Sequence, residues 1–238
     1  IYNKNKTIEF NLNNLKHPIT LRCIRADMQS FINTFIDPYL ELKPYFENTK
    51  FVIDAGANIG YTAALYANWW PNATIVSVEP DTENYDLTLQ NTKHYSNVKV
   101  INAGLWYNNA LLKIEAGQED GFVVREVINT KNVETQNLTQ GITIDNIMQQ
   151  YNVAEIDFLK MNIEGSEKEI FTYNYKNWLP KTKAMLIELH DGKNQGCAKA
   201  VFSTTNQYNF AVAETANYGV LFCQEKTYRE WYASWYKH

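Results

Sequence analysis

Cysteine, clustered positive charge and long hydrophobic runs are all scarce in this chain of 238 residues. Its three cysteines, Cys23, Cys197 and Cys223, are odd in number and far apart, which argues against a disulfide framework and a compact metal-binding knuckle. We therefore expect reduced, buried thiols and a reducing compartment, the cytoplasm.

The charged residues are nearly balanced, with 22 Lys and Arg against 26 Asp and Glu, and the net charge is -4. Nucleic-acid binding depends on clustered Lys and Arg, so we expect no nucleic-acid partner. No apolar run approaches the roughly 20 residues that cross a membrane, and no signal peptide is visible. Because the chain begins with Ile1 and not with Met, we expect a processed or shortened product. An upstream targeting segment is compatible with this expectation.

A hydrophobic content of 45% over this length is enough for one full core. We expect residues 1–47 to form an extension with an edge strand or hairpin and a helix, and residues 48–238 to form one α/β domain. The helix is predicted from Asp27 because apolar residues then recur at helical spacing. Its expected apolar face consists of Met28, Phe31, Ile32, Phe35 and Ile36.

The chain is organised around residues 51–60, where a short apolar run meets an acid and a glycine-containing turn. The run predicts a buried strand, and Gly56 and Gly60 allow the backbone to turn sharply and approach a ligand closely. We expect Asn58 to cap the following helix and Pro71 to end it. A strand, turn and helix in this order commonly bind a nucleotide-like ligand.

This turn differs from two common phosphate-binding turns. The dinucleotide fingerprint has glycines near the places of Asn58 and Tyr61, and a P-loop has Lys and then Ser or Thr where Tyr61 and Thr62 stand. The run 74–80 predicts a second strand that ends at Glu79, the place of the acid that accepts ribose hydroxyls in Rossmann-type folds. A ribose without phosphates indicates S-adenosylmethionine.

Two continuous apolar runs, residues 156–159 and 184–187, are typical of buried parallel strands, whose carboxyl ends bind ligands. Strand side chains alternate between two sides, so polar residues two apart share a side. The pairs that share a side are Asn162 with Glu164 and Glu188 with His190. If the two strands are neighbours, these four side chains converge.

Other segments complete the expected architecture. Asp81 is the predicted N-cap of a helix, and residues 98–101 predict a third strand. Alternating runs at 111–114 and 122–127 predict a β-hairpin insertion on the substrate side. Two further strands, at 210–213 and 219–222, are consistent with an antiparallel sheet edge.

Two helix starts are also predicted in the C-terminal half of the chain. Capping boxes are expected at Ser166 with Glu169 and at Thr227 with Glu230. A final helix then carries an aromatic stripe of Tyr228, Trp231, Tyr232, Trp235 and Tyr236. This stripe either packs on the chain's own sheet or forms a homodimer contact.

Five motifs together resemble the FkbM family of S-adenosylmethionine-dependent methyltransferases, over about residues 50–190. They are Asp54-Ala-Gly-Ala-Asn-Ile-Gly60, Val78-Glu-Pro-Asp81, Ile144-Asp145, Leu159-Lys-Met-Asn-Ile-Glu-Gly-Ser-Glu167 and Ile187-Glu-Leu-His190. The resemblance implies a Rossmann-like class I methyltransferase fold of the α/β class. Such a fold has a mainly parallel seven-stranded sheet, helices on both faces and an antiparallel edge strand.

The resemblance also implies S-adenosyl-L-methionine as the cofactor. The implied cofactor-binding residues are Asp54, Gly56, Asn58, Gly60, Glu79, Pro80, Asn102 and Ala103. It places the helix after Asp27 over the cofactor pocket as a partial lid, whereas the residues alone fit a helix that caps the sheet edge.

The implied catalytic residues are His190, Glu164, Glu188 and Asn162, with His190 as general base. We expect O-methylation of a hydroxyl on a sugar or small polar metabolite, so the partner is a small-molecule or glycan acceptor. The family commonly has Asp where this chain has Asn162, so an alternative is a binding protein with weak or no turnover. A neutral amide is also a poor magnesium ligand, so we expect no metal. The missing dinucleotide fingerprint argues against a nucleotide-dependent oxidoreductase.

Overall fold

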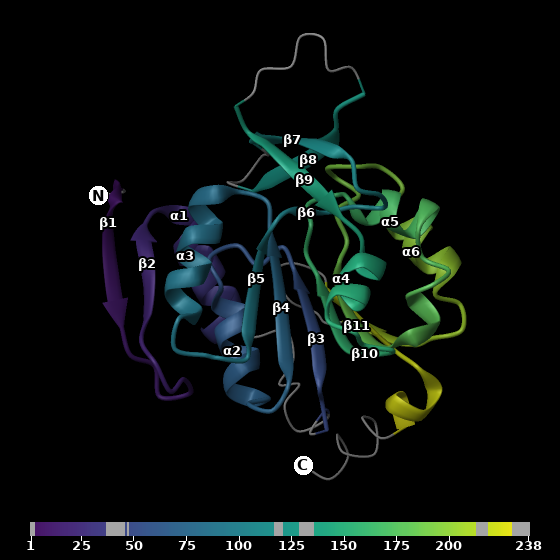
Figure 1. The fold of residues 1–238 in the computed structure, drawn as a ribbon, viewed down its shortest axis with the longest axis horizontal. Coiled ribbons are helices and arrows are strands. Elements are labelled where there is room, and N and C mark those ends of the chain that lie inside the picture. Colours follow the sequence, from purple (N-terminus) through teal and green to yellow (C-terminus); the bar gives the residue numbers. More distant parts are fainter. Residues whose placement is uncertain are drawn as a thin grey trace.

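The computed structural model describes residues 3–36, 46, 48–116, 121–128, 136–212 and 219–229. Within them, a seven-stranded sheet lies between two layers of helices (Figure 1). From one edge to the other, its strands are β12 (Asn209–Val212), β13 (Gly219–Cys223), β11 (Thr182–Glu188), β10 (Ile156–Met161), β3 (Phe51–Ala55), β4 (Thr74–Glu79) and β5 (Val98–Asn102).

Strand directions confirm the mainly parallel sheet. Neighbours from β5 to β11 pair in parallel. In chain order, crossovers that contain at least one helix join β3 to β4, β4 to β5, β5 to β10 and β10 to β11, and the crossover from β5 to β10 also contains the insertion. Strand β13 runs antiparallel to both of its neighbours. The antiparallel strand therefore lies one position inside the edge, and the edge strand itself is β12.

Helices cover both faces of the sheet (Figure 1). On one face, α2 (Tyr61–Trp69) and α3 (Thr82–Thr92) share a buried apolar cluster with the sheet. On the other, α4 (Ile144–Gln150), α5 (Glu167–Tyr173) and α6 (Cys197–Thr204) share a second cluster. A short 3-10 helix, Leu179–Lys181, leads into β11. Burial of large side chains on both faces stabilises the sheet by roughly 1.5–3 kcal/mol for each Leu, Ile or Phe.

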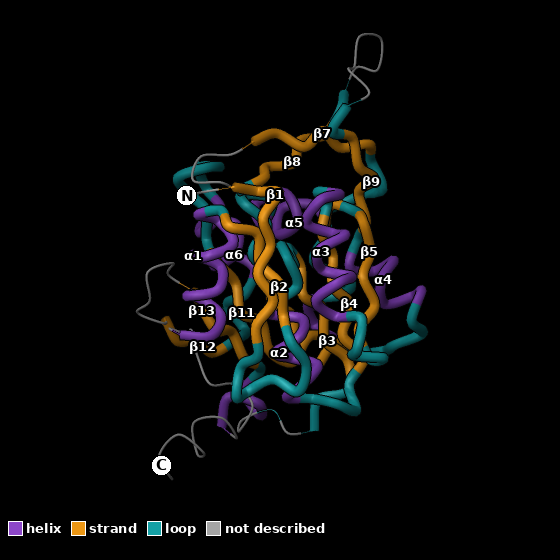
Figure 2. The backbone as a smooth tube through the Cα atoms, turned by 90° about the vertical axis from the view of Figure 1, so that its left-hand side faces the viewer, coloured by secondary structure: helices purple, strands orange, loops and turns teal. Residues whose placement is uncertain are grey.

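The N-terminal segment forms the predicted hairpin, β1 (Asn3–Phe10) with β2 (Ile19–Cys23), as an antiparallel pair. Figure 2 shows the two strands side by side on the outside of the molecule. Ile19 and Leu21 are buried in the cluster that contains α2 and α3, so β2 packs on this helix layer.

The predicted helix after the hairpin is present, but its apolar face differs. Helix α1 (Arg25–Phe31) continues as a π-helix, Ile32–Ile36. Phe31 and Phe35 pack against the core, whereas the other three predicted face residues are exposed: Met28, Ile32 and Ile36. The π-helix has i→i+5 hydrogen bonds and more residues per turn than an α-helix, so the spacing of about 3.6 residues does not continue over Ile32–Ile36. Of the predicted face, only Phe31 and Phe35 pack against the core.

The predicted β-hairpin insertion is confirmed as β7 (Leu111–Ala116) paired with β8 (Phe122–Glu126). It belongs to a second sheet of four strands with β6 (Gly104–Leu105) and β9 (Leu138–Ile142), which stands above the carboxyl ends of the main sheet in Figure 1. Its inner side chains form a small separate core of Trp106, Leu112, Ile114 and Val124.

One predicted helix cap is confirmed and two are wrong. The Asp81 carboxylate accepts from the Asn84 backbone N–H at the start of α3. Asn58 does not cap α2, because the helix begins only after Gly60, which has φ 82°. Ser166 has helical φ and ψ angles, so its hydroxyl cannot reach the orphan N–H groups and makes no cap.

Near the end of the chain, residues 225–229 make a helical turn. The second member of the Thr227–Glu230 box and all of the aromatic stripe except Tyr228 lie outside the described residues. All three cysteines are free thiols, with Cys197 and Cys223 buried and Cys23 partly so. No helix among the described residues is both long and apolar enough for a membrane span.

The turn after β3 generates a test of the fold. In Gly56, with φ 74°, a Cβ atom would lie 1.8 Å from the backbone oxygen of Asn162. We expect Gly56→Ala to lower the free energy of unfolding by roughly 2–4 kcal/mol, through left-handed strain and overpacking. Gly192→Ala is the matched control, because a Cβ atom there meets no atom within 4 Å. Equal urea midpoints for the two variants would contradict the prediction.

Candidate active site

Backbone hydrogen bonds to β4 hold the turn between β3 and α2 in place. The N–H groups of Gly56 and Ala57 both donate to the carbonyl of Val78, at 3.0 and 3.1 Å. Asn58 has a positive φ of 51°, which an asparagine tolerates better than most residues. The turn therefore lies directly on the end of β4, with its backbone facing a cavity.

Glu79 ends β4 and is almost completely buried. Its carboxylate accepts from the Asn58 N–H at 2.8 Å and from the Asp81 N–H at 3.0 Å. Burial raises the pKa of Glu79 to about 8, although these two N–H donors favour the charged form. Among the described residues, each carboxylate oxygen accepts only one of these bonds, so Glu79 can accept further hydrogen bonds from a ligand.

A buried ion pair supports the turn from behind. The Lys160 ammonium lies 3.1 Å from Asp54 Oδ1 and donates to the Gly56 carbonyl at 2.7 Å. Asp54 has no exposed surface, and neither of its oxygens makes a well-aligned hydrogen bond with the described residues. Lys160 therefore joins β10 to the turn and balances the charge of Asp54.

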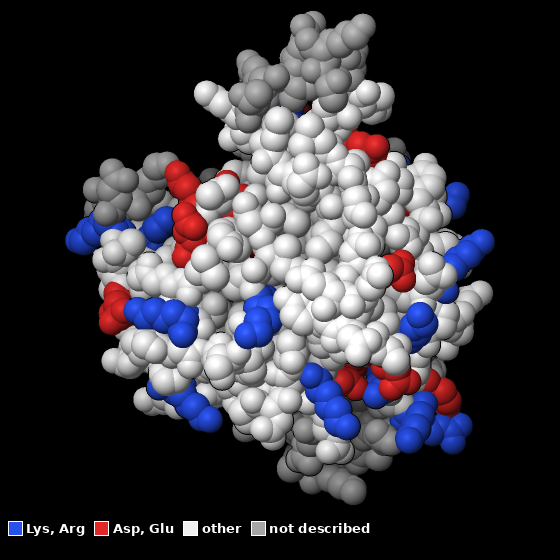
Figure 3. Space-filling view, in the orientation of Figure 1, with Lys and Arg blue, Asp and Glu red and all other residues white. Residues whose placement is uncertain are grey.

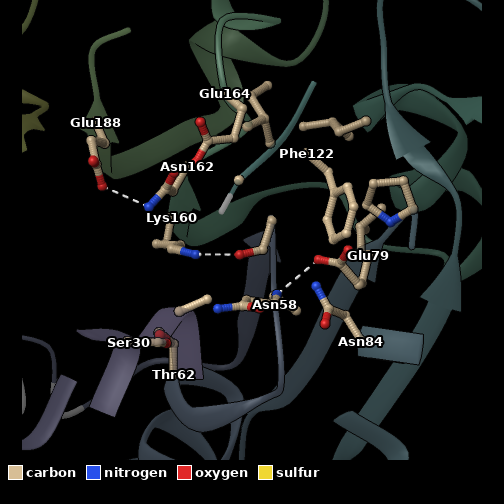
Figure 4. A pocket seen from close by; sticks show the side chains of 18 of the residues that line it. Ser30, Asn58, Thr62, Glu79, Asn84, Phe122, Lys160, Asn162, Glu164 and Glu188 are labelled. Atoms are coloured by element: carbon tan, nitrogen blue, oxygen red, sulfur yellow. Dashed lines mark hydrogen bonds between the residues drawn. The ribbon is translucent and has the colours of Figure 1, made fainter. Parts of the chain in front are cut away.

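The cavity has a volume of about 520 Å³ and lies at the carboxyl ends of β3, β4, β10 and β11. Figure 4 shows side chains from the turn, from the ends of the strands and from the insertion facing one another across it. It joins the predicted cofactor residues to the predicted catalytic ones, because both sets contribute to its walls. The predicted residues that line it are Gly56, Asn58, Glu79, Pro80, Asn162, Glu164, Glu188 and His190.

Four predicted cofactor residues do not line this cavity. Asp54 and Gly60 lie behind the turn, where they support its shape. Asn102 donates from Nδ2 to the carbonyls of Glu79 and Pro80, at 2.9 and 3.1 Å, and the Ala103 N–H donates to the Glu79 carbonyl. Asn102 and Ala103 thus hold the ends of β4 and β5 together, and Gly104 and Leu105 reach the cavity instead.

The predicted convergence at the ends of β10 and β11 is confirmed. These strands are neighbours, and Asn162 Nδ2 donates to Glu188 Oε2 at 2.6 Å. His190 Nε2 lies 3.6 Å from Glu188 Oε1 and 3.9 Å from Glu164 Oε2. The four predicted side chains therefore form one group around His190 Nε2.

Sequence reasoning did not include Glu167 among the site residues. This carboxylate has no exposed surface and faces His190 Nδ1 at 2.9 Å. It also accepts from the backbone N–H groups of Ile163 and Gly165, at 3.2 and 2.9 Å. The sequence did place Glu167 at the end of the fourth motif. The orientation of its side chain toward His190, however, depends on the preceding turn, whose conformation could not be predicted from the sequence.

That turn is strained at Glu164, which has a positive φ angle of 59°, whereas Gly165 adopts its φ angle of 107° without a steric penalty. Lys193 forms an ion pair with the Glu164 carboxylate. The insertion rests on the same carboxylate, because a Cβ atom on Gly121 would lie 2.8 Å from Glu164 Cδ. Glu164 is therefore held between the insertion and the loop after β11.

His190 is only 9% exposed, and its environment favours the charged imidazolium. Burial lowers the pKa of His190, but hydrogen bonds to Glu167 and Glu188 and the nearby Glu164 charge outweigh burial and raise it to about 10. Without a ligand, the imidazole is therefore protonated at neutral pH.

Helix α1 and the π-helix that continues it form a wall of the cavity, as the lid interpretation implied. The polar residues on that wall are Arg25, Gln29, Ser30, Asn33 and Thr34. Within the described residues, no cluster of three or more His, Cys, Asp or Glu side chains has a metal-binding arrangement. Lys and Arg are scattered over the face drawn in Figure 3, singly or beside acidic residues, without a broad basic patch there.

Comparisons with solved structures place the chain beside several methyltransferases. An rRNA methylase from Streptococcus thermophilus is 11% identical with a TM-score of 0.48, and the match covers 77% of this chain and 91% of that one. An O-methyltransferase from Bacillus cereus in complex with SAH is 12% identical (TM-score 0.46, coverage 77% and 76%). Fibrillarin from Aeropyrum pernix with bound S-adenosyl-L-methionine is 12% identical (TM-score 0.45, coverage 76% and 68%). No curated protein sequence matches.

The sequence itself matches one family, described as the methyltransferase FkbM domain, over residues 54–229. This match starts at Asp54 in β3 and extends beyond β13, so it includes the carboxyl end of every main-sheet strand that contributes to the cavity. The chain belongs to the FkbM methyltransferase family, and it is an S-adenosylmethionine-dependent methyltransferase.

Proposed function

We propose that this enzyme methylates a hydroxyl oxygen on a sugar or another small polar metabolite. The observation that carries the proposal is the meeting of Glu79 with the Asn162, Glu188 and His190 group in one cavity. A hydroxyl acceptor needs hydrogen-bond partners and a group that takes its proton. This group of side chains provides both.

The residues of the turn fit the cofactor. Glu79 would accept hydrogen bonds from the ribose hydroxyls, and Gly56 has no side chain where the backbone meets the cavity. When bound, S-adenosylmethionine supplies an electrophilic methyl group on a positively charged sulfur. The glycine turn would hold the cofactor in the cavity that the ends of β10 and β11 also line.

His190 is the proposed general base. Its Nδ1 faces the buried Glu167, so Nε2 is the ring atom that is left to accept the proton of the hydroxyl. Glu167 and Glu188 stabilise the imidazolium that forms. The positively charged sulfur of bound S-adenosylmethionine would disfavour a second positive charge on the imidazole. The pKa of His190 should therefore be lower than about 10 when the cofactor is bound.

The base assignment predicts a specific pH profile. Only a neutral imidazole accepts a proton, so the rate should rise with pH, with a midpoint between about 6.5 and about 10. His190→Ala should lose this rise and roughly a hundredfold to ten-thousandfold in turnover while it keeps its cofactor affinity. Glu167→Gln removes a charge that raises the pKa, so its midpoint should move to lower pH. An unchanged midpoint in Glu167→Gln, or near-parent turnover in His190→Ala, would refute the assignment.

The cofactor site predicts a different pH dependence. Ribose hydroxyls donate to a carboxylate better than to a carboxylic acid, so affinity for S-adenosylhomocysteine should rise with pH through about 8, the pKa of Glu79. Glu79→Gln should bind roughly tenfold to a hundredfold more weakly at high pH, and its affinity should not change near pH 8. Calorimetry from pH 6 to 9 measures both effects. A parent affinity that falls over this range would contradict the role of Glu79.

Asn162 decides between turnover and the alternative of binding alone. Its Nδ2 donates to Glu188 at 2.6 Å, a contact that an aspartate cannot make unless it is protonated. The Asn162 amide is therefore a better partner for Glu188 than the aspartate that the family commonly has at this position. We predict that Asn162→Asp turns over more slowly than the parent because two carboxylates would face each other. Faster turnover in this variant would favour the binding interpretation.

The same amide supports metal-independent catalysis. Asn162 contributes a neutral oxygen where the family commonly has a carboxylate, and hard cations prefer anionic oxygen ligands. We predict that methyl transfer continues in an excess of a chelator. Loss of activity on chelation, with recovery on addition of magnesium, would show that the prediction is wrong.

A further inference from the structure

Asn84 lies beside Glu79 at the cavity wall (Figure 4). It was not among the predicted site residues. It belongs to α3, is 5% exposed and lines the cavity with its side chain. Its Oδ1 accepts from Arg22 Nη2 at 2.6 Å, whereas its Nδ2 has no hydrogen-bond partner among the described residues. A buried amide is thus satisfied on one side only.

The orientation of this amide is determined by Arg22. A guanidinium group has only donors, so the atom of Asn84 that faces it must be the oxygen. Arg22 is fixed in turn by Asp27, which is fully buried and accepts from Arg22 Nε at 2.9 Å and from Nη2 at 2.8 Å. The NH2 group of Asn84 consequently points into the cavity, on the side of Glu79 (Figure 4).

Glu79 and Asn84 have complementary chemistry for a hydroxyl group. The Glu79 carboxylate only accepts hydrogen bonds, and the free NH2 group of Asn84 only donates them. A hydroxyl donates one hydrogen bond and accepts others, so it is satisfied between the two. Asn84 is also joined to Glu79 through Asp81, which accepts from the Asn84 N–H at 2.9 Å and donates to Glu79 at 3.0 Å.

We propose that Asn84 is a further cofactor-binding residue, which donates a hydrogen bond from Nδ2 to a ribose hydroxyl oxygen of the nucleoside. Arg22 is a positioning residue that holds the amide in the donating orientation. Arg22 lies before residue 54, where the family match begins, so the N-terminal segment contributes to the cofactor site. The proposal rests on the proposed role of Glu79 toward the same hydroxyls.

Calorimetry with two ligands tests the proposal, S-adenosylhomocysteine and its 2′,3′-dideoxy analogue. Asn84→Ala should bind S-adenosylhomocysteine roughly threefold to tenfold more weakly and the dideoxy analogue as tightly as the parent does. Asn84→Asp should lose at least as much, since its carboxylate still accepts from Arg22 but cannot donate. Arg22→Lys keeps the charge beside Asp27 without the planar fork, and should show a smaller loss, again only with the ribose hydroxyls present.

Asp86→Ala, at an exposed position of the same helix, is the control for helix perturbation, and thermal unfolding checks that each variant folds. Equal losses for both ligands, or no loss with S-adenosylhomocysteine, would overturn the role of Asn84. Glu79→Gln separates the two ideas. If only Glu79→Gln weakens binding, the inference about Asn84 fails, and if only the Asn84 variants do, the proposed role of Glu79 fails.

Discussion

The contact between the Gly56 backbone and the Asn162 carbonyl is the constraint on which the site depends. A Cβ atom at Gly56 would overlap that carbonyl, and the Asn162 N–H donates to Ala55 at 3.0 Å. This close approach brings the nucleotide turn of β3 against the end of β10. The residues proposed for the cofactor and those proposed for the acceptor therefore line one cavity.

Charge in the site is arranged around two buried acids with different partners. Glu79 faces backbone N–H donors and an amide, and burial raises its pKa to about 8. Glu167 faces His190 and stabilises an imidazolium. One acid is thus suited to recognition and the other to the control of a proton, although both are buried glutamates near the carboxyl end of the sheet: Glu79 ends β4, and Glu167 begins α5.

The sequence was sufficient for the features that follow from local pattern. The strands, the glycine turn, the hairpin insertion and the convergence of Asn162 with Glu188 and His190 were predicted from apolar runs, alternation and motif order. The capping roles of Asn58 and Ser166 failed because backbone angles decide a cap, and both residues adopt other angles. Glu167 and Asn84 were missed because their roles depend on partners that are distant in the sequence, His190 and Arg22.

The central claim is that a hydroxyl oxygen receives the methyl group in this cavity. The most direct measurement uses S-adenosylmethionine with a ¹³C-labelled methyl group, a panel of glycans and small alcohols, and NMR of the product. The account predicts a labelled methyl carbon with the chemical shift of a methyl ether, formed by the parent and lost in His190→Ala. A labelled methyl group on nitrogen or carbon, or equal product from His190→Ala, would contradict it.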